Sequence, residues 1–195
     1  MNFEEYAAKP LLADAGIATP KGTVVTTPEE TAAAAAALGR CVVKAQVPAG
    51  KRGKAGGVRV VDSPEQAQAT AQAILGMVIG GHRVERVLVE QSVRIERELY
   101  AAVLNDPASQ GPLVLFSTLG GMDIEEAAAT DPDSIRRAAI DIRHGFDQAA
   151  ASALLTGLDL AAATQALSAL LVKLYDVYRN HDAELVEINP LALTD

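Results

Sequence analysis

Glycines and cations alternate over residues 42–57, VVKAQVPAGKRGKAGG, and this stretch is the clearest candidate for chemistry in the chain. It contains no acidic residue, although the chain has a formal net charge of −8 at pH 7. The glycines are Gly50, Gly53, Gly56 and Gly57, and the cations are Lys44, Lys51, Arg52 and Lys54. Backbone N–H groups of a glycine loop can approach an anion because glycine has no Cβ. The pattern predicts a strand that delivers Lys44, followed by a loop that binds polyphosphate.

Two common phosphate-binding motifs are absent from this stretch. A Walker loop would have Ser or Thr after Gly53-Lys54, where the chain has Ala55, and Gly five residues before Gly53, where it has Pro48. The glycine spacing also differs from G-x-G-x-x-G, the dinucleotide-binding fingerprint. A basic, glycine-rich hairpin without a ligand is the competing interpretation.

A second candidate site is the pair Glu187 and Asn189. The two residues are two apart in a segment that we expect to be extended, so both side chains lie on one face. One carboxylate and one amide oxygen suit a Mg²⁺ ion that is held mainly by water and phosphates. The alternative is that the strand ends here and that Asn189-Pro190 begins a turn.

Two further carboxylates lie at or inside expected strands. Glu90 ends the strand VERVLVE, at the place where two lobes would join, and Glu98 lies within an apolar strand. A carboxylate inside a strand must be solvated, paired or bound to a ligand. Glu98 could therefore accept hydrogen bonds from ribose hydroxyls or pair with a loop cation, and an outward-facing side chain is the alternative.

Histidine and cysteine indicate neither a zinc site nor a disulfide. His82, His144 and His181 are far apart and lack ligand spacing. The single cysteine, Cys41, excludes an internal disulfide and fits a reducing compartment.

Composition excludes several classes of partner. The acidic charge balance argues against binding to nucleic acid or to an anionic membrane surface, both of which favour basic proteins. No stretch approaches the roughly 20 apolar residues that cross a bilayer, and the first residues do not resemble a secretory signal. We expect a cytoplasmic protein with no nucleic-acid or membrane partner.

The elements that position these residues follow the order strand, helix, strand, strand, helix, strand over residues 23–90, which is typical of a split βαβ lobe. Thr27-Pro28-Glu29-Glu30 and Ser63-Pro64-Glu65 predict the two helix starts. The second of these helices is expected to reach residue 79 and to end at Gly80-Gly81.

Outside this lobe the spacing of apolar residues predicts a larger α/β lobe. The expected helices cover residues 2–15, 133–140, 146–155 and 159–178, and the expected strands cover residues 97–104, 112–118 and 185–188. The fold class is thus α+β or α/β. A smaller lobe, residues 19–94, is inserted into a larger lobe, residues 1–18 plus 95–195, with a nucleotide cleft between them.

Together these pieces resemble the nucleotide-binding part of a succinyl-CoA synthetase β subunit, an ADP-forming acyl-CoA ligase with an ATP-grasp fold. The resemblance covers the whole chain. It is carried by Asn2-Phe3-x-Glu5-Tyr6-x-Ala8-Lys9, Val42-Val43-Lys44-x-Gln46-Val47, Arg52-Gly53-Lys54-Ala55-Gly56-Gly57-Val58, Leu88-Val89-Glu90, Glu98-Leu99-Tyr100, Gly120-Gly121 and Glu187-Ile188-Asn189-Pro190-Leu191.

The resemblance implies an acid–thiol ligase of the tricarboxylic acid cycle that uses Mg²⁺ and ATP, with GTP as the alternative nucleotide. It also implies a partner, an α subunit whose histidine is phosphorylated. The implied roles are phosphate binding for Lys44, a loop over the phosphates for Lys51, Arg52 and Gly53, nucleoside contacts for Glu90, Val93 and Glu98, a Mg²⁺ ligand for Asn189, and a catalytic place near the partner's histidine for Glu187.

The chain departs from the family pattern at three positions and at its end. The family commonly has His and Gly where this chain has Pro48 and Lys51, and a small polar residue where it has Val93. Related subunits continue beyond the position of Asp195 into a second Mg²⁺ aspartate and a CoA-ligase domain. Residues 1–195 are therefore expected to be a single ATP-grasp domain that lacks the CoA-ligase domain and does not complete the ligase reaction alone.

Two other functions compete with this one. The first is a non-catalytic ATP-grasp module for nucleotide sensing or subunit association. The second is an ATP-grasp carboxylate–amine ligase, which the Glu-Ile-Asn-Pro ending and the Arg-Gly-Lys-Ala-Gly-Gly loop disfavour by resemblance.

Overall fold

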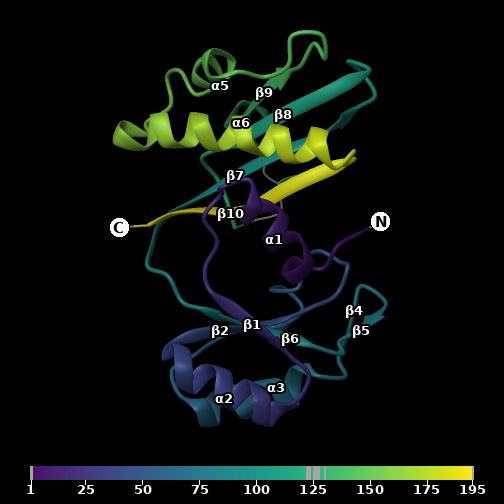
Figure 1. Cartoon of the computed structure of the whole chain (residues 1–195), viewed down its shortest axis with the longest axis vertical. Coiled ribbons are helices and arrows are strands. Elements are labelled where there is room, and N and C mark those ends of the chain that lie inside the picture. Colours follow the sequence, from purple (N-terminus) through teal and green to yellow (C-terminus); the bar gives the residue numbers. More distant parts are fainter. Residues whose placement is uncertain (1, 122–123, 125–127, 130, 195) are drawn as a thin grey trace. The chain divides into compact units, whose positions relative to one another are not determined.

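The computed structural model describes residues 2–194 except 122–123, 125–127 and 130. Its contacts divide the chain into two units (Figure 1). The first unit comprises Met1–Ala13 with Ala18–Val93, and the second comprises Asp14–Ile17 with Arg94–Asp195. Both units mix helices and strands, as the sequence predicts, and the strands in each sheet pair antiparallel.

The first unit contains a four-stranded sheet whose order is β1-β6-β2-β3. The strands are β1 (Gly22–Val25), β2 (Cys41–Ala45), β3 (Val58–Val61) and β6 (Val87–Gln91). Every neighbouring pair is antiparallel, so β1 and β2 run parallel with β6 between them. This is the split βαβ arrangement, and it confirms the predicted order of elements.

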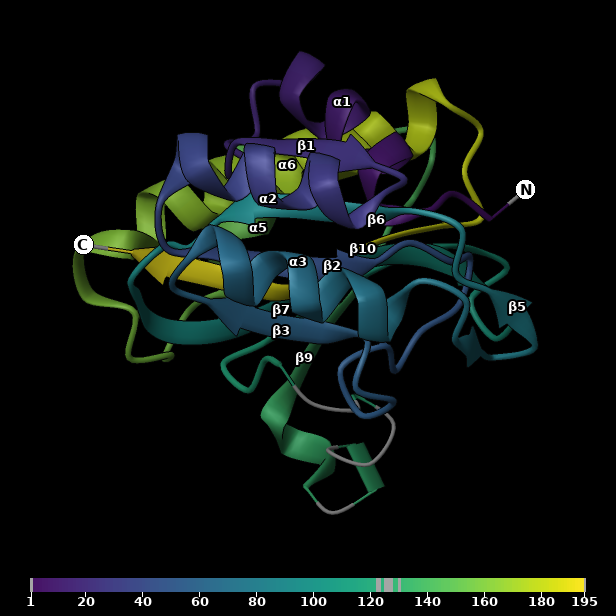
Figure 2. The ribbon, with the colours of Figure 1, turned by 90° about the horizontal axis from the view of Figure 1, so that it is seen from below.

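Helices α2 (Pro28–Leu38) and α3 (Pro64–Ile74) lie side by side on one face of this sheet (Figure 2). Both begin at the predicted caps. The Thr27 hydroxyl accepts from the Glu30 N–H in a full capping box, and the Ser63 hydroxyl accepts from the Gln66 N–H. Alternate strand residues pack beneath the helices in a buried aliphatic core that includes Cys41, Val43, Ala45, Val87 and Val89.

Helix α1 (Glu5–Asp14) packs on the polar residues that alternate with this core, among them Lys44 and Glu90. The sequence placed residues 1–18 in the larger lobe. The structure instead groups Met1–Ala13 with the first unit, because α1 is joined to its sheet by ion pairs and by the hydrogen bond from the Tyr6 N–H to Gln46 Oε1 at 3.0 Å.

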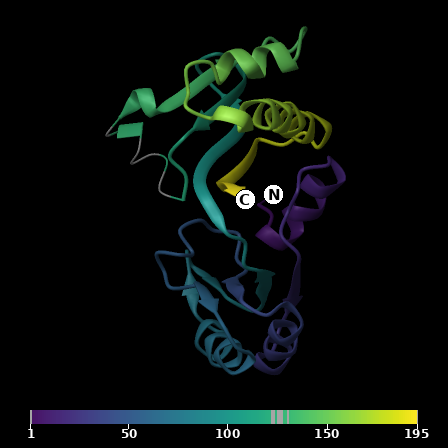
Figure 3. The same cartoon turned by 90° about the vertical axis from the view of Figure 1, so that its left-hand side faces the viewer.

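The second unit contains a sheet whose order is β10-β7-β8-β9. Its strands are β7 (Ile95–Asp106), β8 (Gly111–Ser117), β9 (Ile135–Ala139) and β10 (Leu185–Thr194), and β7 forms a long bent ribbon (Figure 3). Helices α5 (Gln148–Leu154) and α6 (Thr164–Asn180) pack on this sheet and on each other. The buried side of α6 includes Leu167, Leu171, Leu174 and Tyr178.

Three predicted boundaries are wrong. Residues 133–140 form a short 3₁₀ turn, Pro132–Ser134, and then the edge strand β9 rather than a helix, because they pair with β8. Helix α3 ends at Ile74, and Gly80-Gly81 form the turn of a small hairpin between β4 (Val78–Ile79) and β5 (His82–Arg83). Strand β10 runs on through Asn189-Pro190 to Thr194, so no turn begins there.

None of the helices in the described part of the chain is long and apolar enough to cross a bilayer.

Candidate functional site

The glycine-rich loop follows β2 and leads into β3, as the sequence predicts. Several of its N–H groups are used inside the loop: Gly57 donates to the Arg52 carbonyl at 2.8 Å, Ala55 to Lys51 at 3.1 Å and Gly56 to Gly53 at 2.9 Å. The N–H groups of these three residues are therefore engaged by the loop itself. The positive charge at this end of the sheet is supplied by side chains.

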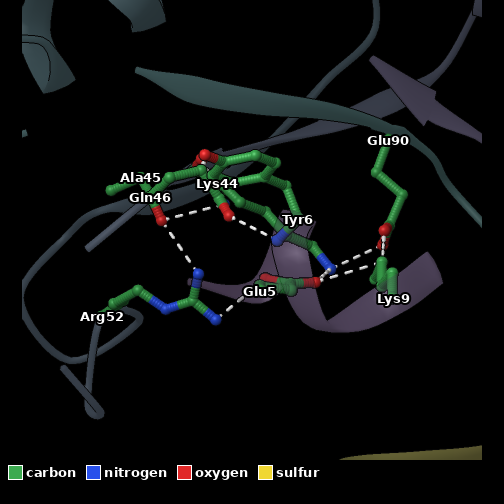
Figure 4. Close-up of polar contacts among 8 residues, drawn as sticks. All are labelled: Glu5, Tyr6, Lys9, Lys44, Ala45, Gln46, Arg52 and Glu90. Carbon is green, nitrogen blue, oxygen red and sulfur yellow. Dashed lines mark hydrogen bonds and ion pairs between the residues drawn. The ribbon is translucent and has the colours of Figure 1, made fainter. Parts of the chain in front are cut away.

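Lys44 lies at the centre of an ion cluster that we define as Glu5, Lys9, Lys44, Arg52 and Glu90 (Figure 4). Its ammonium group is 2.9 Å from Glu5 Oε1 and 2.5 Å from Glu90 Oε1. Three cations and two carboxylates leave one positive charge in excess. All five side chains are largely buried, with 6–22 % of each exposed.

The other two cations share the same carboxylates. Arg52 Nη2 lies 2.8 Å from Glu5 Oε2, while its Nη1 donates to the Ala45 carbonyl at 2.9 Å. Lys9 is 3.1 Å from Glu5 Oε1 and also pairs with Glu90. The cluster thus joins one helix (α1), two strands (β2 and β6) and the glycine loop.

Burial and neighbouring charge set the protonation of this cluster. Burial raises the pKa of Glu5, but the charges of Lys44, Arg52 and Lys9 outweigh burial and lower it to about 2. Burial lowers the pKa of Lys9 from its ordinary value. The charge of Lys44 lowers it further, whereas the charge of Glu5 raises it. Glu5 is therefore a carboxylate at neutral pH.

A buried amide anchors α1 beside the cluster. Gln46 accepts from the Tyr6 N–H through Oε1 and donates through Nε2 to the carbonyls of Lys44 and Ala45, both at 3.1 Å. Arg86 donates to the Tyr6 hydroxyl at 2.7 Å and lies against the Tyr6 ring. These contacts fix the first turn of α1, on which Glu5 lies.

Of the predicted site residues, the structure brings together Lys44, Arg52 and Glu90. The contacts of Glu90 differ from those expected. Glu90 was expected to contact the nucleoside, and here it pairs with Lys44 and Lys9. Lys51 is exposed and has a left-handed backbone with φ +61°, and Gly53 is also exposed. Val93 is half-buried in the segment between β6 and β7.

Glu98 lies on β7 in the second unit, and its side chain is exposed. Its carbonyl accepts from the Gly120 N–H at 3.0 Å. A side chain at Gly121, where φ is +71°, would collide with the Glu98 carboxylate. Gly120-Gly121 therefore allow the backbone to pass close to Glu98.

Glu187 and Asn189 are both exposed on β10 and alternate with the half-buried Val186 and Ile188, as predicted for one face of a strand. Asn189 Oδ1 accepts from the Gly121 N–H at 2.9 Å. The two side chains offer oxygen donors of the kind that Mg²⁺ takes along with water and phosphate. Among the described residues no group of three or more His, Cys, Asp or Glu could hold a metal by itself.

Glu187 also lines a cavity of about 590 Å³ within the second unit. Tyr100, Arg137 and Glu184 line the same cavity. The hollow gives Glu187 a position beside a space that a second molecule could enter.

The sequence analysis missed Glu5 and Lys9 as members of the site. Their spacing of four residues on a helix is a weak signal for an ion pair. Both also belong to the N-terminal motif that supports the family resemblance, but nothing local connects them with residues 44–52.

Comparison with sequence families supports the expected class. The family model described as an ATP-grasp domain matches residues 2–193. The β subunit of the ADP-forming succinate–CoA ligase of Rubrobacter xylanophilus is 46% identical over 196 residues, which cover 100% of this chain and 51% of that protein. The β subunit of the GDP-forming ligase of Thermus thermophilus is 44% identical over 195 residues, 100% of this chain and 52% of that protein. The chain spans about half the length of these relatives.

Solved structures show the same fold. ATP citrate lyase from Methanothrix soehngenii superposes with a TM-score of 0.75 at 24% identity, over 98% of this chain and 47% of that one. The dinucleotide-forming acetyl-coenzyme A synthetase 1 of Ca. Korarchaeum cryptofilum gives a TM-score of 0.74 at 22% identity, over 97% and 86% of the two chains. At such identities the likeness shows the fold alone.

Proposed function

Since the chain belongs to the ATP-grasp domain family, we propose that it binds a Mg²⁺–nucleotide as part of an ADP-forming carboxylate–CoA ligase similar to succinyl-CoA synthetase. The observation that carries the proposal is the cluster of Lys44, Arg52 and Lys9, three partly desolvated cations at the mouth of a glycine loop. Cations in such a setting bind phosphate oxygens more strongly than exposed ones do. The similarity of the whole chain to β subunits of succinate–CoA ligases supports the same function.

Lys44 and Arg52 have the geometry for binding adjacent phosphate oxygens. The planar guanidinium of Arg52 can bind two oxygens at once, and the ammonium of Lys44 is a compact point charge. Lys51 and Gly53 would lie over the phosphates in the loop. Val93 and Glu98 would serve the nucleoside, while Glu90, for which the sequence suggested the same role, would hold Lys44 in place. ATP is the proposed nucleotide, and the GDP-forming relative makes GTP the alternative.

Asn189 would contribute an oxygen ligand to Mg²⁺, an ion that neutralises phosphate charge when it is bound. The donor set fits, since Asn189 Oδ1, which accepts from the Gly121 N–H, and the carboxylate of Glu187 are oxygen donors on the same face of β10. Glu187 would accept a hydrogen bond from an imidazole N–H and so orient a histidine that receives the phosphate. That histidine would belong to the partner α subunit of the ligase.

Calorimetric titration with Mg²⁺–ATP tests nucleotide binding. We expect Lys44→Ala to weaken binding by about 1.5–3 kcal/mol, roughly 10- to 150-fold, because a charge-assisted contact is lost. Arg40→Ala is the matched control: it removes one positive charge from an exposed pair with Asp62 in the same unit and should leave the affinity unchanged. Equal affinities of parent and Lys44→Ala would contradict the proposal.

Phosphate transfer is a separate step of the proposal and needs its own experiment. The chain, γ-³²P-ATP and the α subunit of a succinate–CoA ligase are incubated with Mg²⁺, and acid-labile label on the α subunit is measured. Label on the α subunit supports the ligase function if the amount of label decreases when Glu187→Gln replaces the parent. Nucleotide binding without any label would instead favour a non-catalytic module.

A further inference from the structure

Glu5 occupies the position between the phosphate-binding cations. One of its oxygens is 2.9 Å from Lys44 and 3.1 Å from Lys9, and the other is 2.8 Å from Arg52. A carboxylate that spans a lysine and an arginine in this way uses the same donors that a phosphate would use, because both anions present paired oxygens to cationic N–H groups. Figure 4 shows the carboxylate of Glu5 in this position.

The two cations do not depend on Glu5 for their positions. Lys44 extends from β2 and is also held by Glu90, whose side chain is 6 % exposed on the neighbouring strand β6. Arg52 is also held by the Ala45 carbonyl, at 2.9 Å. Each cation therefore keeps one anchor on the sheet if Glu5 leaves.

Glu5 itself is the one of these three acceptors that lies outside the sheet. It is the first residue of α1, whereas Glu90 and Ala45 lie in the strands of a hydrogen-bonded sheet. A rotation of the Glu5 side chain about its own torsions requires no break in sheet hydrogen bonding. It is thus the acceptor that can be exchanged most easily.

We propose that Glu5 is an internal counter-anion of the phosphate site, which occupies Lys44 and Arg52 in the nucleotide-free protein and is displaced when the phosphate chain of a nucleotide binds. The proposal rests on the proposed function and adds an affinity-determining residue to it. The ligand class is a nucleoside triphosphate or diphosphate, whose phosphates take over the two cations. Glu5 then sets the affinity by competition, and its presence limits binding of weaker anions.

Removal of the Glu5 charge tests the competition. We expect Glu5→Gln to bind Mg²⁺–ATP about three- to tenfold more tightly than the parent, since an anion that competes for two cations is gone. Glu4→Gln is the matched control, because it makes the same change in net charge at the adjacent residue, whose carboxylate is 3.9 Å from Arg86 and outside the cluster. Glu4→Gln should bind like the parent.

The outcomes separate this inference from the proposed function. If the parent binds nucleotide and Lys44→Ala weakens it, but Glu5→Gln binds equally or more weakly than Glu4→Gln, then Glu5 only positions the cations and the inference is overturned. If neither the parent nor Glu5→Gln binds nucleotide, both the proposed nucleotide binding and the displacement of Glu5 are contradicted.

A second measurement needs no variant and covers the case in which Glu5→Gln fails to fold. A crystal structure of the parent with Mg²⁺ and a non-hydrolysable ATP analogue should place Glu5 more than 4 Å from both Lys44 Nζ and Arg52 Nη2. Glu5 found at its present distances of 2.9 and 2.8 Å beside a bound phosphate chain would overturn displacement.

Discussion

The two carboxylate oxygens of Glu5 are contacted by three cations, Lys9, Lys44 and Arg52, and these charges set the pH at which Glu5 takes up a proton. Burial alone would raise its pKa, but the surrounding charges lower it from 4.5 to about 2. A carboxyl whose pKa is lower in the folded state contributes stability above its unfolded pKa and loses it as the pH falls through the folded pKa. The contribution of Glu5 is therefore full above about pH 4.5 and lost towards pH 2.

Urea unfolding at a series of pH values checks this sign. The free energy of unfolding of the parent minus that of Glu5→Gln should decrease as the pH falls from 5 to 2, by up to about 3 kcal/mol. The variant serves as the control because it keeps every other titrating group. A difference that stays constant over this range would show that the cations do not stabilise the Glu5 carboxylate.

The sequence predicted Lys44, Arg52 and Glu90 as site residues and missed the other two members of this cluster, Glu5 and Lys9. Lys44 and Arg52 lie in one short stretch that also contains four glycines, and this local pattern pointed to phosphate. Glu5 meets Lys44 across 39 residues and Arg52 across 47. Such contacts depend on how α1 packs against the sheet, and no local pattern encodes that packing.

At the scale of elements, the glycine loop contains a backbone conformation that its sequence does not favour. Lys51 has φ +61°, in the left-handed region where a Cβ costs roughly 1 kcal/mol or more. Lys54, in the same loop, does not lie in that region. The two lysines therefore form a matched pair for substitution.

We expect Lys51→Gly to be about 1–2 kcal/mol more stable than Lys54→Gly. Glycine relieves the left-handed strain at position 51, whereas position 54 has no such strain to relieve. The entropy that glycine adds to the unfolded chain, about 0.5–1 kcal/mol, is common to both substitutions. Both substitutions remove one positive charge, so charge does not explain the difference. Thermal or urea unfolding measures it, and equal stabilities would show that the loop does not constrain Lys51.

Elements with local signals were predicted well, and elements that depend on a neighbour were not. The caps at Thr27 and Ser63 lie next to the helices that they start, and both helices begin where expected. Residues 135–139 become a strand because β8 offers an edge to pair with. The hairpin of β4 and β5 has two residues in each strand, which is too short to show a period of two.

At the scale of the whole molecule, bound nucleotide should stabilise the fold. A ligand that binds only the folded state adds RT ln(1 + [L]/Kd), about 2.7 kcal/mol when its concentration is 100 times Kd. We expect Mg²⁺–ATP to raise the unfolding midpoint of the parent in a concentration-dependent manner and to raise that of Lys44→Ala much less at equal concentration. Scanning calorimetry with and without nucleotide measures both shifts. Identical shifts for the two proteins would place the stabilising site away from Lys44.

The position of β6 in its sheet also bears on how the protein emerges from the ribosome. β6 is the last strand of the first sheet along the chain, yet it lies between β1 and β2 and supplies the only strand that pairs with β1 in the described sheet. A nascent chain that has not yet exposed Val87–Gln91 outside the exit tunnel can form the β2–β3 hairpin and the helices but cannot assemble the four-stranded sheet. During synthesis, β1 must therefore remain unpaired until more than sixty further residues have followed it.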